Sequence, residues 1–221
     1  RSAESPHRDD SSEGLDTVRG LGQLACEGSP GASKTGQDAP RLAEVSSDTT
    51  GAFTPPRPLA ADDDTAAFDC GRDALNRWFR RHAWRNQELG VSRITVICDA
   101  EAGGIGGYVS LSTAQVERAW LPKLQQRNRP DPMPAILLGQ LAVDLQWQGQ
   151  GIARSLMFYA LTTAVRLSDQ VGCFCVLTHP LDDDVRALYA AFGFEDLPFD
   201  PARSMAVRIA DLVRSGFGTA D

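Results

Sequence analysis

The stretch QWQGQGIARSLMFYAL, residues 146–161, joins a glycine turn to a long amphipathic helix. At a helix start the first backbone N–H groups have no partner and the helix dipole is positive, so an anion binds there. Gly149 and Gly151 let the backbone approach that anion without interference from a Cβ atom. Neither a P-loop lysine nor the third glycine of a dinucleotide fingerprint follows. The stretch therefore predicts a phosphate-binding turn of another kind.

The composition predicts one folded domain with a disordered N-terminal segment. The chain has 221 residues and 42% hydrophobic residues, which suffices for one domain with its own core. Residues 1–50 are rich in Ser, Gly, Asp, Pro and Thr and show no sustained hydrophobic period, so we expect them to be disordered. We place the folded domain at residues 51–221.

The charge pattern leaves nucleic acid open as a partner. Of the formal charge of -7, most lies in residues 1–67, which hold 6 Lys and Arg against 12 Asp and Glu, while the rest holds 16 against 17. No apolar run is long enough to span a bilayer and no secretory leader opens the chain, so we expect a cytoplasmic protein without membrane contact. The 5 cysteines and 3 histidines form no zinc-ligand spacing, so no metal is expected.

Hydrophobic periodicity predicts a mixed α/β domain. A helix with Asp69 as N-cap is expected over residues 69–89, and a proline-rich loop over residues 120–134. Further helices are expected from Gly151 onward and over residues 182–192. The expected strands are 57–60, the hairpin 92–117, 135–144, 173–180, one starting at FEDLP, and 203–209.

Two groups of basic residues stand out in the folded part. The helix cluster consists of Arg77, Arg80, Arg81 and Arg85, of which three are spaced i, i+4, i+8 on one helix face. The loop cluster consists of Lys123, Arg127 and Arg129. Taken alone, the helix cluster is best explained as a solvated helix face.

The order of five motifs resembles the GNAT acetyltransferase family. These motifs are FDCG, GGYVSLS, PAILLGQLAVD, GQGIARSLM and ALYAAFGF. The closer likeness is to the tRNA-acetylating GNAT toxins of bacterial type II toxin–antitoxin systems, and it covers roughly residues 57–210. The resemblance implies a GNAT fold, with a mixed, mostly antiparallel, splayed sheet flanked by helices, and acetyl-CoA as acetyl donor. Thr178-His179-Pro180 departs from the small or acidic run often found there in the family.

The resemblance also implies roles for individual residues. The pyrophosphate of the coenzyme would bind the backbone amides of residues 148–153. The backbone N–H groups of residues 141–143 would stabilise the oxyanion and align the pantetheine arm. Tyr189 would act as the general acid that protonates the departing thiolate, although its apolar helix stripe also fits a core aromatic. The predicted coenzyme-binding residues are Leu141, Ala142, Val143, Gln148, Gly149, Gln150, Gly151, Ile152, Ala153 and Arg154.

Three polar residues near these motifs receive smaller roles. Asp144 is expected to cap a turn rather than to serve as a base. Ser110 and Ser112 are expected to line the acceptor cleft, because neither has the glycine elbow of a nucleophile. His82 is expected in the core or at its rim.

The absence of an obvious carboxylate base favours an α-amine as acceptor, because an α-amino group is largely deprotonated near neutral pH. Both basic clusters would then hold the phosphates of a tRNA acceptor stem around the cleft. We therefore expect aminoacyl-tRNA and a DNA-binding antitoxin as partners, and leave a homodimer open. The alternatives are a GNAT acting on a protein N-terminus, a lysine or a small amine, and a non-enzymatic coenzyme-binding partner in an antitoxin–DNA complex.

Overall fold

The computed structural model describes residues 52–218, so the expectations for residues 1–50 lie outside the described residues. Seven strands form one sheet in the order β1-β2-β3-β4-β5-β7-β6. Only β4 and β5 pair in parallel, and the other neighbours are antiparallel. The prediction of a mixed, mostly antiparallel sheet is confirmed. The strands are β1 (Arg57–Pro58), β2 (Arg93–Cys98), β3 (Ile105–Val116), β4 (Met133–Val143), β5 (Cys175–Thr178), β6 (Glu195–Asp196) and β7 (Met205–Arg208).

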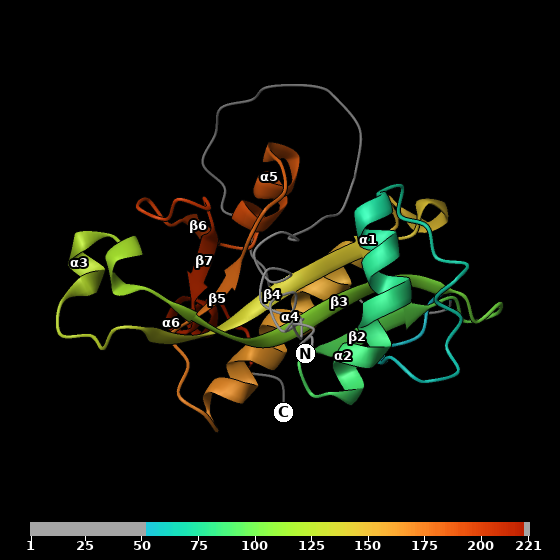
Figure 1. The fold of residues 1–221 in the computed structure, drawn as a ribbon, viewed down its shortest axis with the longest axis horizontal. Helices are drawn as coiled ribbons and strands as arrows, with labels where there is room; N and C mark the ends of the chain where they lie inside the picture. The colour runs from blue at the N-terminus through green and yellow to red at the C-terminus, as the bar shows by residue number, and fades with distance from the viewer. Residues whose placement is uncertain (1–51, 219–221) are drawn as a thin grey trace, which may run out of the picture.

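Helices cover both faces of the sheet (Figure 1). The α-helices are α1 (Asp73–Trp78), α2 (Trp84–Glu88), α3 (Lys123–Gln126), α4 (Ile152–Ser168), α5 (Asp183–Ala191) and α6 (Ile209–Arg214). The π-helix η2 (Phe79–Ala83) joins α1 to α2, and the 3-10 turns η3 (Arg118–Trp120) and η4 (Leu145–Trp147) complete the set.

Two adjacent residues of β3 show which helix lies on which face. The ring of Tyr108 stacks on Phe79 of η2 with centroids 4.0 Å apart, and its hydroxyl donates to the carbonyl of Leu75. A Cβ atom at Gly107 would lie 2.8 Å from Ile152 of α4. Neighbouring strand residues point to opposite faces, so α1, η2 and α2 cover one face and α4 covers the other.

The first helix begins four residues later than predicted. The carboxylate of Asp69 accepts hydrogen bonds from the backbone of Gly71 and the side chain of Asn76, so it holds the preceding loop instead of capping the helix. Gly71 has a φ of +77°, which is incompatible with a right-handed helix, and α1 starts only at Asp73. The prediction of Asp69 as N-cap was wrong for this reason.

Other boundaries also differ from the predictions. The expected loop at 120–134 contains the last residue of η3 and the whole of α3, and its last two residues already belong to β4. The expected strand at 173–180 is paired only over Cys175–Thr178. The last strand ends at Arg208, and α6 follows directly, burying Ile209 and Leu212 against the core.

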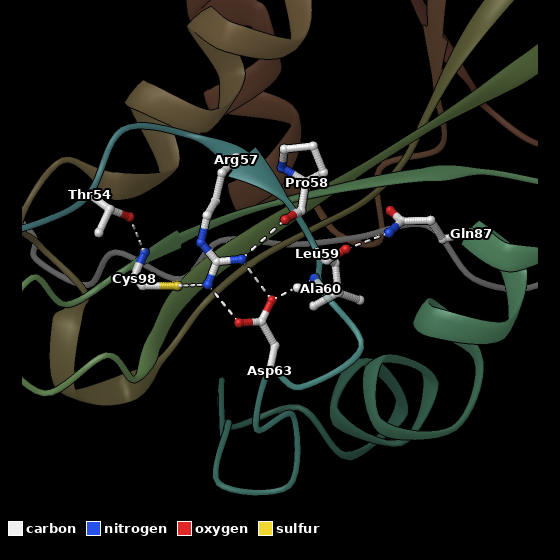
Figure 2. A network of polar contacts seen from close by, with 8 residues as sticks. All are labelled: Thr54, Arg57, Pro58, Leu59, Ala60, Asp63, Gln87 and Cys98. Carbon is white, nitrogen blue, oxygen red and sulfur yellow. Dashed lines mark hydrogen bonds and ion pairs between the residues drawn. The ribbon is translucent and has the colours of Figure 1, made fainter.

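A polar network fastens the edge strand β1 to the domain (Figure 2). Both terminal nitrogens of Arg57 donate to the carboxylate of Asp63, at 2.8 and 2.6 Å, and one of them also donates to the sulfur of Cys98. The Arg57 guanidinium holds the pKa of Asp63 below its usual value. Gln87 of α2 donates to the carbonyl of Leu59, so the segment after β1 is tied to the first helical layer.

Candidate active site

The predicted phosphate turn lies between η4 and α4. Gly149 and Gly151 have φ values of +76° and +82°, and no heavy atom lies within 4 Å of a Cβ built on either residue. These glycines are therefore required by the left-handed backbone rather than by a lack of space. Gly151 is the N-cap of α4 and no side chain caps the helix. The first amides of α4 thus remain available for an anion, as the sequence predicts.

The sheet opens next to this turn. Strand β4 pairs with β5 only from Ala135 to Leu138, while its pairing with β3 continues to Val143. The N–H of Asp144 donates to the carbonyl of Gly106 on the β3 side. Because antiparallel pairing alternates, the amide of Ala142 also faces β3, and those of Leu141 and Val143 face the opening.

The opening thus distinguishes the amides of Leu141, Ala142 and Val143, which the sequence predicts as one group of coenzyme-binding residues. Two of them, Leu141 and Val143, face the space between β4 and β5, so their N–H groups are open to a hydrogen-bond acceptor that enters it. The amide of Ala142 points the other way, toward β3. The loop is held against this strand by Gln148, whose side-chain nitrogen donates to the carbonyl of Val143 at 3.2 Å.

Tyr189 is fully buried on α5, and its ring packs against Phe194 with centroids 5.3 Å apart. Its hydroxyl has no hydrogen-bond partner within the described residues. Burial raises the pKa of Tyr189 to about 12, and the nearby Thr178 hydroxyl offsets part of that increase. Thr178 is the last residue of β5, so the phenol lies near the point where the sheet opens. A buried hydroxyl without a partner fits a proton donor whose acceptor arrives with the substrate.

The small polar residues have structural partners. Asp144 caps η4 by accepting from the backbone of Gln146, and it also accepts from the backbone of Asp69, which agrees with the capping role. The hydroxyl of Ser110 accepts from the backbone N–H of Gln140 at the irregularity between β3 and β4. His82 is exposed on η2 and does not belong to the core.

The two basic clusters lie at different ends of the sheet. In Figure 1, α1 and α2 lie at the right and α3 lies at the far left. The helical segment that carries the helix cluster packs on Tyr108 through Phe79. The loop cluster follows Val116, which is about 25 Å further along β3 at the usual rise per residue. The two clusters are therefore separated along β3, and their joint contact with one tRNA stays a prediction.

The cations within each cluster differ in their exposure and in their contacts. Arg77, Arg80 and Arg81 line a shallow hollow together with Asp73 and Asn76, and Arg80 donates to the carbonyl of Phe68. Arg77, Arg81 and Arg85 are exposed and form no ion pair within residues 52–218. In the loop cluster, Lys123 and Arg127 are exposed, but Arg129 lies over the ring of Phe174 at 4.5 Å.

Two residues of the site were not predicted from periodicity. Thr178 is buried between Tyr189 and the backbone of Leu138, to which its hydroxyl donates at 3.0 Å. His179 follows it and lies 2.6 Å from the hydroxyl of Ser204. The only sequence signal for this pair is its departure from the run expected after the strand at 173–180.

Comparison with known proteins agrees with this geometry. Residues 91–196 match the acetyltransferase (GNAT) domain family. The chain is 37% identical over 153 residues to a protein of Mycobacterium tuberculosis (strain ATCC 25618 / H37Rv) named tRNA-acetylating toxin, covering 69% of this chain and 91% of that protein.

Several solved structures share the fold at higher than 25% identity, and two of them carry ligands in their names. One is AtaT complexed with acetyl-methionyl-tRNAfMet, with 28% identity, a TM-score of 0.68, and coverage of 73% of this chain and 98% of that chain. The other is AtaTR bound with acetyl-CoA, with 28% identity, a TM-score of 0.65, and coverage of 74% and 97%. None of the helices within residues 52–218 has the length and apolar character needed to cross a membrane.

Proposed function

The chain belongs to the GNAT acetyltransferase family and is an acetyl-CoA-dependent N-acetyltransferase, and we propose that its acceptor is the α-amino group of an aminoacyl-tRNA. A relative named tRNA-acetylating toxin and a structural neighbour complexed with acetyl-methionyl-tRNAfMet support this acceptor. The observation on this chain that carries it is the helix cluster. Arg77, Arg81 and Arg85 are exposed cations without ion pairs in the described part of the chain, as phosphate binding requires.

Different residues at the opening between β4 and β5 take part in different steps of acetyl transfer. Acetyl-CoA supplies an activated acyl group as a thioester. The amides of residues 148–153 and the charge of Arg154 hold its pyrophosphate at the start of α4. The amides of Leu141 and Val143 align the pantetheine arm and stabilise negative charge on the thioester oxygen.

Tyr189 supplies the proton that the departing sulfur requires. Its pKa of about 12 keeps the phenol protonated at neutral pH, so the proton is present when the thiolate forms. The hydroxyl makes no competing hydrogen bond within the described residues. Transfer to the sulfur therefore disturbs only the interaction with the nearby Thr178 hydroxyl.

Inhibition of translation follows from this chemistry, because an acetylated α-amine no longer attacks as a nucleophile. A protein with this activity needs a partner that restrains it, and we expect a DNA-binding antitoxin in that role. The loop cluster, at the other end of the sheet, would contact a separate part of the tRNA or the antitoxin.

Mass spectrometry of total aminoacyl-tRNA after incubation with the protein and isotopically labelled acetyl-CoA tests the proposal. Labelled N-acetyl groups on the amino acids of one or a few tRNAs are expected. Labelling of proteins or polyamines, with every aminoacyl-tRNA unlabelled, would overturn the acceptor assignment.

A further inference from the structure

The loop that precedes α1 is anchored to the end of β4. The N–H of Asp69 donates to the carboxylate of Asp144 at 2.9 Å, and the carbonyl of Asp69 accepts from the N–H of Leu145 at 2.9 Å. A Cβ atom at Gly71 would lie 3.2 Å from the side chain of Leu145, so the loop and η4 are in close contact. Asp144 and Leu145 directly follow β4, so the loop is fixed relative to the end of that strand.

An ion pair joins this loop to the start of α5. The Nη2 atom of Arg72 donates to Oδ2 of Asp182 at 3.0 Å. The other carboxylate oxygen of Asp182 accepts from the backbone N–H of Val185, so Asp182 is at the same time the N-cap of α5. The side chains of Arg72 and Asp182 are 37% and 35% exposed, so the pair is half-buried.

The ion pair connects the ends of two strands that have already separated. Strands β4 and β5 run parallel and pair as far as Leu138 and Thr178. Strand β4 continues to Val143, where the anchored loop meets it, whereas Asp182 lies four residues beyond the end of β5. The Arg72–Asp182 pair therefore spans the opening of the sheet.

The position of α5 depends on polar contacts. Among its described residues only Val185 and Tyr189 are buried, so little apolar surface holds the helix in place. Tyr189 follows Asp182 by seven residues, or about two helical turns, so both lie on the same side of the helix. On the side of β6, Arg186 forms an ion pair with Asp196. The helix is therefore held from two sides, by β6 and by the loop before α1.

We propose that Arg72 and Asp182 are positioning residues that hold Tyr189 at the opening of the sheet. The pair fixes the start of α5 relative to the end of β4, and the phenol two turns further along moves with that start. A displacement of about 1 Å can slow an enzyme about a hundredfold, whereas a half-exposed ion pair contributes little to stability. Loss of the pair should therefore affect the rate more than the melting temperature. The inference rests on the proposed function, because it concerns the proton donor of the same acetyl transfer.

Asp182→Asn removes the charge and keeps the helix cap, because an asparagine side-chain oxygen still accepts from the N–H of Val185. The assay is single-turnover acetyl transfer from saturating acetyl-CoA to aminoacyl-tRNA and, separately, to an amino-acid methyl ester. We expect the rate to fall about ten- to hundredfold for both acceptors, with unchanged acetyl-CoA affinity and a melting temperature within about 2 °C of the wild type. Asp183→Asn is the matched control and should keep the wild-type rate, because the carboxylate of Asp183 is exposed and lies 3.9 Å from Arg203.

Combination with Tyr189→Phe tests whether the ion pair acts through the phenol. If the pair positions Tyr189, Asp182→Asn should cause no further loss of rate in the Tyr189→Phe background. Arg72→Gln should also slow the transfer, and adding Asp182→Asn to it should cause no further loss. Losses that multiply in either combination would show that the residues act independently and would overturn the inference.

The acceptors and the single variants distinguish failure of this inference from failure of the proposed function. Turnover of the methyl ester without turnover of any aminoacyl-tRNA overturns the tRNA assignment, and the methyl ester then still compares Asp182→Asn with Asp183→Asn. An Asp182→Asn protein with the same rate as Asp183→Asn overturns the positioning role alone. A wild-type rate for Tyr189→Phe overturns the proton donor itself, and with it this inference.

Discussion

Replacing Tyr189 by phenylalanine should abolish activity while making the protein more stable. The substitution removes one hydroxyl and keeps the ring that packs on Phe194. Loss of a general acid typically lowers the rate by about 10²- to 10⁴-fold. Because the phenol contacts neither the phosphate turn nor the helix cluster, affinity for acetyl-CoA and for tRNA should remain close to that of the wild type.

The stability gain follows from the missing partner of the hydroxyl. A buried polar group without a hydrogen bond costs about 1–3 kcal/mol of desolvation, and the hydroxyl of Tyr189 has no partner within the described residues. Proximity to Thr178 recovers part of that cost, so we expect a gain of about 1 kcal/mol. For a domain of this size, that gain corresponds to a rise of about 2–4 °C in melting temperature.

Alkaline pH should lower the stability of the wild-type protein through ionisation of Tyr189. The unfolded phenol ionises near pH 10, whereas burial raises the folded pKa of Tyr189 to about 12. Its contribution to stability is therefore complete below pH 10 and is lost as the pH rises from 10 to 12. The free energy of unfolding should fall by about 3 kcal/mol over this range, because the pKa of the phenol is about two higher in the folded than in the unfolded protein. The Tyr189→Phe protein should not show this loss.

The assay combines single-turnover acetylation of aminoacyl-tRNA with urea unfolding at pH 8 and pH 11. Tyr159→Phe, on the half-buried side of α4, is the control for the loss of a tyrosine hydroxyl. A Tyr189→Phe protein that acetylates at close to the wild-type rate would show that the thiolate receives its proton elsewhere. A variant that is inactive but less stable would refute the account of an unpartnered hydroxyl.

Three further perturbations probe other parts of the molecule. Gly151→Glu should weaken acetyl-CoA binding at least about tenfold in calorimetry, because it places a carboxylate at the helix start and a side chain at positive φ, and unchanged affinity would contradict the phosphate assignment. The double change Arg77→Gln and Arg81→Gln should weaken tRNA binding and flatten its salt dependence while sparing turnover of a methyl ester, as filter binding at several salt concentrations would reveal. Asp63→Asn should destabilise the fold by about 1–3 kcal/mol in urea unfolding at pH 7, because Arg57 loses its charged partner. The difference in stability between wild type and variant should shrink as the pH falls through the depressed pKa of Asp63, because the wild-type carboxylate is then protonated as well.

The sequence by itself determined the features that depend on neighbouring residues. The apolar pairs after Gly151 specify α4, and the two glycines specify the left-handed turn before it. Asp182 and Gly193 bracket α5 as its N-cap and its terminating residue, which places Tyr189 in the last turn of that helix. These signals are local because helix formation and turn geometry are decided over a few residues.

Only the tertiary structure decided which of these local features meet. The length of pairing between β4 and β5 leaves the amides of Leu141 and Val143 facing the opening, and no pattern within one strand states where its neighbour ends. Asp69 follows the helix pattern of an N-cap, yet its bonds to Gly71 and Asn76 hold it in the loop.

The positions of the two basic clusters and of His179 also depend on contacts between residues that are distant in the sequence. The clusters look equivalent in sequence, but twelve residues of β3 and the folding of the α3 segment place them at opposite ends of the sheet. His179 and Ser204 are 25 positions apart and meet because β5 and β7 pair side by side. Contacts between distant residues depend on strand register and sheet order, which the whole chain sets through the burial of its core.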